Sequence, residues 1–157
     1  MSTIPDDLLD TLDFLIHRYH LHSRLPVDIA PITEKFEISR YNFTPMTMGF
    51  ALVRPKQIYI GTNQNLDIAW QRLALAHEAA HVIANQQERF FVCKTNDWSR
   101  DHNERQAQLI AAYLLVPQKV VQENYRVGAA PRLAKALKVP PDLVDLRWSF
   151  ARVHGDI

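Results

Sequence analysis

Two histidines and a glutamate in the middle of the chain have the spacing of a metal-binding motif. His77, Glu78 and His81 form the pattern H-E-x-x-H. On an α-helix, residues four positions apart lie on one face, so both imidazoles can bind a single metal ion. Neutral imidazoles suit zinc, and a catalytic zinc keeps one position open for water. The metal lowers the pKa of that water to about 7, and Glu78, about 100° round the helix, can accept the proton.

The residues around this motif favour one unbroken helix. Neither glycine nor proline occurs between Gly61 and Pro117, and the residues flanking the motif are mostly apolar. The pattern predicts a helix from Leu66 to about Gln86, with Asn65 as its N-cap. Burying three titratable groups among apolar residues is costly unless they are paired or bound to a metal. A chance occurrence of the motif on a core helix is therefore the less favoured interpretation.

A catalytic zinc site needs a third protein ligand, and the acids after the motif supply the candidates. Glu88 follows His81 too closely to fold back from the same helix. Glu104 lies in the first turn of the next strongly patterned helix, and Gln108 lies one turn further on the same face. An antiparallel partner helix would place both side chains beside the histidines.

Spacing alone leaves two alternatives to Glu104 as the third ligand. Asp101 and Glu104 also fit a capping box, in which the Glu104 carboxylate only reaches back to the start of its own helix. His102, next to the proposed cap, is a rival ligand.

The remaining pattern predicts an α+β fold, with several helices around a small three-stranded antiparallel sheet. Strands are expected at 38–43, 50–53 and 57–60, with a turn region at 45–49 and a hairpin turn at 54–56. Apolar residues at helical spacing predict the other helices. These comprise a first helix from about residue 6 to 19, a short one from 26 capped by Asp28, one from Asp101 stopped by Pro117, one at 120–125 and a C-terminal pair within 131–152.

Length and composition indicate one folded domain over residues 1–157. The chain is 47% hydrophobic and 22% charged, which argues against disorder. A net charge of +1 gives no general reason to expect nucleic acid or an anionic membrane as a partner. The single cysteine, Cys93, cannot form an internal disulfide, and no apolar run is long enough to span a bilayer. We therefore expect a cytoplasmic protein that does not contact membranes.

Three segments, in this order along the chain, resemble the ImmA/IrrE metallopeptidase family. They are the strand Ile58–Ile60, the run Gln71–His81 and the run Glu104–Pro117. The family shows a strand, then R-F-T-x-A-H-E-x-G-H, then E-x-x-A-[ND]-x-F-A-x-x-L-L-M-P. The resemblance covers nearly the whole chain and implies a zincin-like fold of the gluzincin type, with the H-E-x-x-H helix at its centre.

The resemblance also implies roles for individual residues. Zinc would be bound by His77, His81 and Glu104, and Glu78 would be the general base. Gln108 stands where the family usually has Asp or Asn, a position from which an acid orients a ligating histidine in related zincins. The glutamine amide oxygen can still accept a hydrogen bond but brings no charge. Metal affinity or activity is thus expected to be below the family norm.

From this resemblance we expect a zinc endopeptidase that cleaves a helix-turn-helix repressor, of phage or mobile-element type, and so relieves repression. An alternative is a non-catalytic metal-binding module that sequesters a repressor or an antitoxin-like partner. A further alternative is DNA binding through 133–150, whose rhythm faintly resembles a helix-turn-helix. Residues 126–152 hold six basic and two acidic residues, a local charge of +4. A solvated basic face explains this excess, so direct nucleic-acid binding is not expected.

Overall fold

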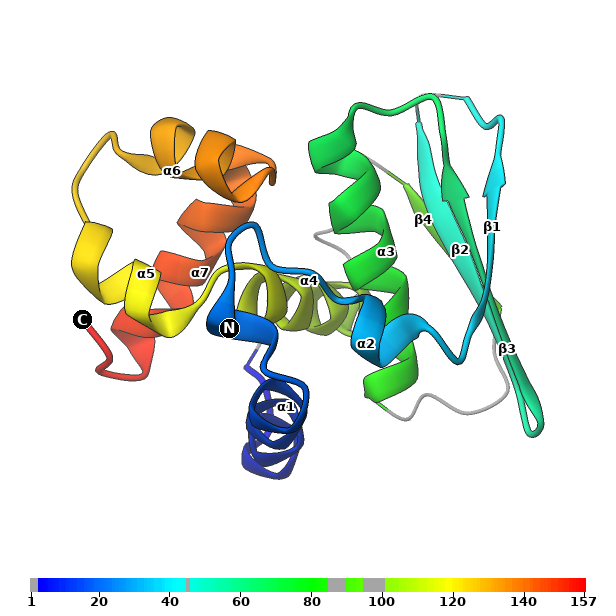
Figure 1. Cartoon of the computed structure of the whole chain (residues 1–157), viewed down its shortest axis with the longest axis horizontal. Coiled ribbons are helices and arrows are strands. Elements are labelled where there is room, and N and C mark those ends of the chain that lie inside the picture. Colours follow the sequence, from blue (N-terminus) through cyan, green and yellow to red (C-terminus); the bar gives the residue numbers. More distant parts are fainter. Residues whose placement is uncertain (1–2, 45, 85–89, 95–100) are drawn as a thin grey trace.

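A four-stranded sheet occupies one end of the molecule, and helices fill the rest (Figure 1). The computed structural model describes residues 3–44, 46–84, 90–94 and 101–157, the segment 90–94 by its backbone alone. The helices are α1 (Asp6–Arg18), the 3₁₀ turn η1 (Leu21–Ser23), α2 (Ala30–Thr33), α3 (Ile68–Ile83), α4 (His102–Leu115), α5 (Gln118–Asn124), α6 (Ala130–Leu137) and α7 (Pro141–Val153). The strands are β1 (Glu37–Tyr41), β2 (Thr47–Arg54), β3 (Gln57–Asn63) and β4 (Phe90–Lys94).

The sheet is mixed, which corrects the expectation of three antiparallel strands. The strand order is β1-β3-β2-β4, with β2 antiparallel to both of its neighbours and β1 parallel to β3. The expected β2–β3 hairpin is present, whereas β1 pairs with the far side of β3. A short connection usually joins antiparallel neighbours, and alternating side chains cannot reveal that a strand instead crosses over.

A buried asparagine holds this crossover in place. Asn63, at the end of β3, has no exposed surface. Its amide nitrogen donates to the carbonyl oxygens of Thr44 at 3.0 Å and Thr47 at 2.8 Å. Its amide oxygen accepts from the backbone N–H groups of Phe43 at 3.4 Å and Asn65 at 3.0 Å. One side chain thus fixes the chain that leads from β1 across to β2.

Helix α3, which carries the H-E-x-x-H motif, lies against β2 and β3. Small residues on this face let helix and sheet approach closely, and a minor apolar core forms there from Phe36, Ala51, Ile60 and Ala79. The larger core lies on the other side of α3 and joins it to α4 and the C-terminal helices. The α3 helix is therefore buried on all sides at its centre, as its largely apolar sequence predicts.

Of the two N-caps that the sequence predicts for α3 and α4, only the one on α4 is present. The α3 helix begins at Ile68, and its N-cap is Asp67, whose carboxylate accepts from the backbone N–H of Trp70 at 3.1 Å. The prediction of Asn65 as the cap is wrong, because the Asn65 side chain donates to Phe43 O at 3.2 Å. Asp101 caps α4 as predicted, accepting from Asn103 N at 2.8 Å. The expected end of α3 near residue 86 lies outside the described residues.

The other helices agree with the sequence pattern apart from their exact ends. The α4 helix ends at Leu115, two residues before Pro117. The helix expected from residue 26 is only the single turn α2, and Asp28 accepts from Ala30 N at 2.9 Å just before it. The helices expected within 131–152 are α6 and α7, which pack on each other. Within the described part of the chain, no helix has the length and apolar character needed to cross a membrane.

Candidate metal centre

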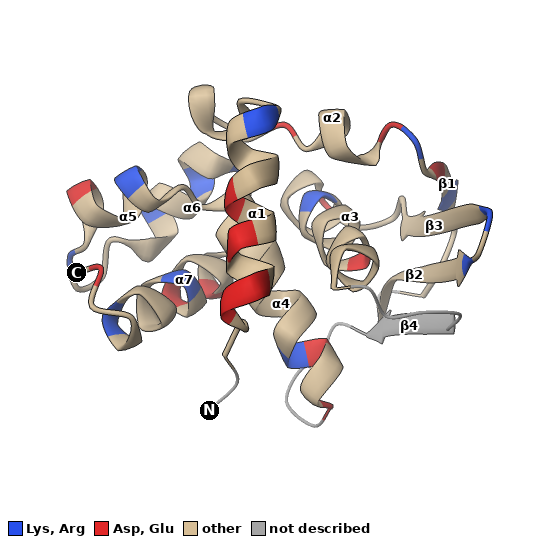
Figure 2. Ribbon diagram, turned by 90° about the horizontal axis from the view of Figure 1, so that it is seen from below, with Lys and Arg blue, Asp and Glu red and all other residues tan. Residues whose placement is uncertain are grey.

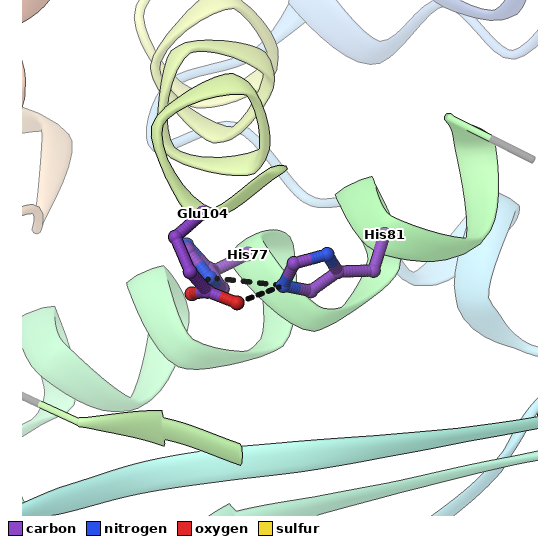
Figure 3. A group of neighbouring side chains, drawn as sticks. All are labelled: His77, His81 and Glu104. Atoms are coloured by element: carbon purple, nitrogen blue, oxygen red, sulfur yellow. Dashed lines mark hydrogen bonds and ion pairs between the residues drawn. The ribbon is translucent and has the colours of Figure 1, made fainter. Parts of the chain in front are cut away.

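His77, His81 and Glu104 meet where α4 crosses α3 (Figure 3). The two histidines lie one turn apart on α3 and are fully buried. Glu104 lies in the first turn of α4, and 19% of its side chain is exposed. The sequence pattern allows an antiparallel partner helix, but α4 instead crosses α3 (Figure 1). The crossing nevertheless presents the start of α4 to the histidines.

The three side chains point their donor atoms at one place. His77 Nε2 lies 3.0 Å from Glu104 Oε2, and His81 Nε2 lies 3.2 Å from Glu104 Oε1. The two Nε2 atoms are 3.2 Å apart. In a tetrahedral zinc site with metal–ligand distances of about 2.0–2.1 Å, neighbouring ligand atoms lie about 3.3 Å apart. The spacing and the donor set of two imidazoles and one carboxylate therefore fit a zinc ion.

The geometry distinguishes Glu104 from its alternatives. The Glu104 carboxylate contacts both histidines, and the N-cap of α4 is Asp101. His102 is exposed and does not belong to the cluster. Burial by itself would raise the pKa of the Glu104 carboxyl, but hydrogen bonds and charge from the two histidines lower this pKa to about 2. The structure thus holds Glu104 as an anion beside the imidazoles, the form that a metal ligand needs.

Gln108 lies behind His77, one turn along α4 from Glu104. Its amide oxygen Oε1 is 2.9 Å from His77 Nδ1, and the residue is buried. An amide oxygen can only accept a hydrogen bond, so His77 donates from Nδ1. In the neutral form of His77, the proton is then on Nδ1 and the lone pair of Nε2 is directed toward the cluster, as metal ligation requires. Gln108 therefore occupies the position from which the sequence predicts a supporting contact.

Glu78 is buried beside the cluster without being part of it. Neither of its carboxylate oxygens has a hydrogen-bond partner among the described residues. Burial, and then the negative charge of Glu104, raises the pKa of the Glu78 carboxyl well above its usual value. A buried carboxyl with raised pKa and free oxygens is suited to accepting a proton.

Gly49 in β2 lies against both Glu78 and the β3 backbone, a contact that the sequence does not reveal. A Cβ atom on Gly49 would lie 3.5 Å from both Cγ and Oε1 of Glu78, and only 2.5 Å from Gly61 O. Any side chain at this position would collide with the β3 backbone. The sequence pattern predicts a turn region at 45–49, whereas Gly49 lies within β2, next to Glu78.

The fold and the cluster together are those expected of a metal-dependent peptidase. Comparison with known families shows that residues 21–149 match Peptidase_M78, the IrrE N-terminal-like domain. The match covers most of the chain, and the chain therefore belongs to this peptidase family, which confirms the ImmA/IrrE resemblance. No curated protein matches the chain.

Proposed function

We propose that this protein is a zinc-dependent endopeptidase. The observation that carries the proposal is the convergence of His77, His81 and Glu104 on one point, with the buried carboxylate of Glu78 next to it. Membership of a peptidase family supports the reaction class. The chemistry of the donor set supports zinc, because two imidazoles and one carboxylate leave a fourth position free.

Each side chain has a distinct part in this reaction. His77, His81 and Glu104 hold the metal, and Gln108 keeps His77 in the tautomer that ligates. When bound, zinc would act as a Lewis acid that lowers the pKa of water and polarises the scissile carbonyl. Glu78 accepts the proton of the attacking water and later donates it to the leaving amine. Its raised pKa makes the carboxylate a stronger base, and burial keeps bulk water away.

We further propose that the substrate is a helix-turn-helix repressor of phage or mobile-element type, whose cleavage relieves repression. The support for this substrate is the family resemblance. The competing proposal is a module that binds metal and sequesters the repressor without cutting it. The neutral Gln108, in place of the acid usual in the family, favours that alternative, because it weakens support for His77.

Glu78→Gln separates the two proposals. The zinc-loaded variant and wild type are incubated with the repressor encoded beside the protein, and cleavage, zinc content and repressor binding are measured. Glutamine keeps the size of the side chain but cannot usefully accept a proton, so cleavage should fall about 10²–10⁴-fold. Zinc and repressor binding should remain. Glu123→Gln, at an exposed position on α5, is the matched control and should cleave like wild type.

Two outcomes would exclude the peptidase. One is absence of any cut by the wild-type, zinc-loaded protein in the presence of bound repressor. The other is full derepression in cells that carry Glu78→Gln, which would assign the effect to sequestration.

A further inference from the structure

A second polar cavity lies between the N-terminal and C-terminal helices and shares no residue with the metal centre. Its volume is about 340 Å³. Figure 2 shows α1 lying across α4, with α7 beside them. We call this space the Arg147 cavity. Its polar lining includes Asp13, His17, His22, Tyr113, Gln118 and Arg147.

Arg147 is the cation of this cavity, and it is only 1% exposed. Its Nε donates to Val116 O at 3.3 Å, and its Nη2 donates to Gln118 Oε1. Among the described residues, Nη1 has no hydrogen-bond partner, and no ion pair joins the guanidinium to a carboxylate. The guanidinium carbon lies 4.7 Å from the centre of the Tyr113 ring and 5.6 Å from that of Phe150. Aromatic faces stabilise the charge in part, but one donor is left unmet.

The acid that lines the cavity is engaged elsewhere. Asp13 on α1 accepts a hydrogen bond from the Tyr113 hydroxyl at 2.8 Å. Burial and then this contact raise the pKa of Tyr113 to about 12, so the phenol keeps its proton and holds Asp13. Asp13 therefore reduces the positive potential of the cavity without forming an ion pair with Arg147.

Two of the histidines that line the cavity differ in burial. His22 Nε2 lies 2.9 Å from Leu114 O, to which it can only donate. Burial, opposed by that hydrogen bond, lowers the pKa of His22. A neutral His22 therefore presents its Nδ1 as an acceptor. His17, in the last turn of α1, is exposed.

We propose that the Arg147 cavity binds a small organic anion whose carboxylate or phosphate group pairs with Arg147. Arg147 makes no ion pair within the described residues, and only the more distant charges of Asp156 and Asp13 offset its own. Burying a guanidinium in this way is costly, and its planar fork suits the two oxygens of either group. The volume is within the range of small-molecule sites. This inference does not depend on the proposed peptidase activity, because none of the lining residues belongs to the metal centre.

Titration of the ¹⁵N-labelled, zinc-loaded protein tests the proposal. Sodium phosphate and sodium acetate are added in separate arms, with sodium chloride at equal ionic strength as the reference. We expect saturable shifts of the Arg147 and Tyr113 resonances in the phosphate or the acetate arm, and the stronger arm identifies the preferred group. Arg147→Met should reduce the affinity by about tenfold or more, since it removes a charge-assisted hydrogen bond. Arg152→Met, an exposed position on the same helix, should bind like wild type.

A second variant covers the case in which Arg147→Met fails to fold. His17→Glu changes an exposed residue and adds a negative charge beside the cavity, so it should weaken anion binding while the protein stays folded. His81→Ala should leave these shifts intact, which separates binding here from binding at zinc. Shifts equal to those caused by chloride, or unchanged in His17→Glu, would overturn the proposal and leave Arg147 as a residue that only ties α7 to α4 and α5.

Discussion

The metal centre and the Arg147 cavity are both polar clusters built partly on α4, and they differ in the charge of the buried ionisable group that has unpartnered atoms within the described residues. At the metal centre, two imidazole nitrogens and a carboxylate converge, and the Glu78 oxygens beside them are unpartnered among the described residues. At the Arg147 cavity, the buried donor Nη1 of Arg147 has no hydrogen-bond partner among the described residues. Surplus acceptors fit a cation and a surplus donor fits an anion.

In each cluster, one residue on α4 holds another side chain in place without being the group that would bind the ligand. Gln108 fixes one histidine by a single hydrogen bond, and Tyr113 holds Asp13 in a similar way. Both supporting residues lie on α4, but each contacts only its own cluster. We therefore expect a change at one of them to leave the other cluster unaffected. The following substitutions test that independence.

The largest effect is expected from His81→Ala. Wild type should carry close to one zinc per chain, and the variant should carry none, because two remaining protein ligands leave the site incomplete. Elemental analysis of the purified proteins measures this. His102→Ala, at an exposed position beside Glu104, should keep its zinc. Full zinc in His81→Ala would refute the assigned site.

Glu104→Gln should strongly lower zinc affinity with little change in helix content. The amide keeps the size of the side chain but loses the negative charge that the histidines hold in place. Competition with a chelator gives the affinity, and circular dichroism gives the helix content. If α4 melts while zinc affinity is unchanged, Glu104 acts on the helix and not on the metal.

A smaller effect is expected at Gln108, which contacts the proposed ligand His77 and is not itself a proposed metal ligand. Gln108→Leu removes the acceptor of His77 Nδ1 and should lower zinc affinity about 10–100-fold. Gln108→Glu keeps the length of the side chain, adds charge and should raise the affinity. Gln106→Leu, a nearby buried position on α4, serves as the control. Equal affinities for all three variants would show that His77 needs no support.

The smallest effect is expected at Tyr113. Tyr113→Phe removes the hydrogen bond to exposed Asp13 and should lower the free energy of unfolding by about 0.5–1.5 kcal/mol. Urea denaturation measures this change, with exposed Tyr19→Phe as the control. Zinc affinity should be unchanged, and a coupled loss of zinc would show that the two clusters are not independent.

Local pattern predicted most of the elements, because helix periodicity, caps and breakers act over a few residues. Asp101 and Pro117 mark the two ends of α4 as expected. Local pattern does not decide between several residues that can fill one role, as when Asp67 rather than Asn65 caps α3. It also missed the direction of β1, since Asn63 supports the crossover through contacts distant in sequence.

The sequence by itself determined that His77 and His81 share a face, because the helical repeat fixes the relation of residues four apart. It also set Glu78 off that face. Only the tertiary structure decided that Glu104, and not His102, meets the histidines, because this choice depends on how α4 crosses α3. The same holds for Gly49 against Glu78 and for Arg147 beside Tyr113, contacts made by packing between elements that no local spacing encodes.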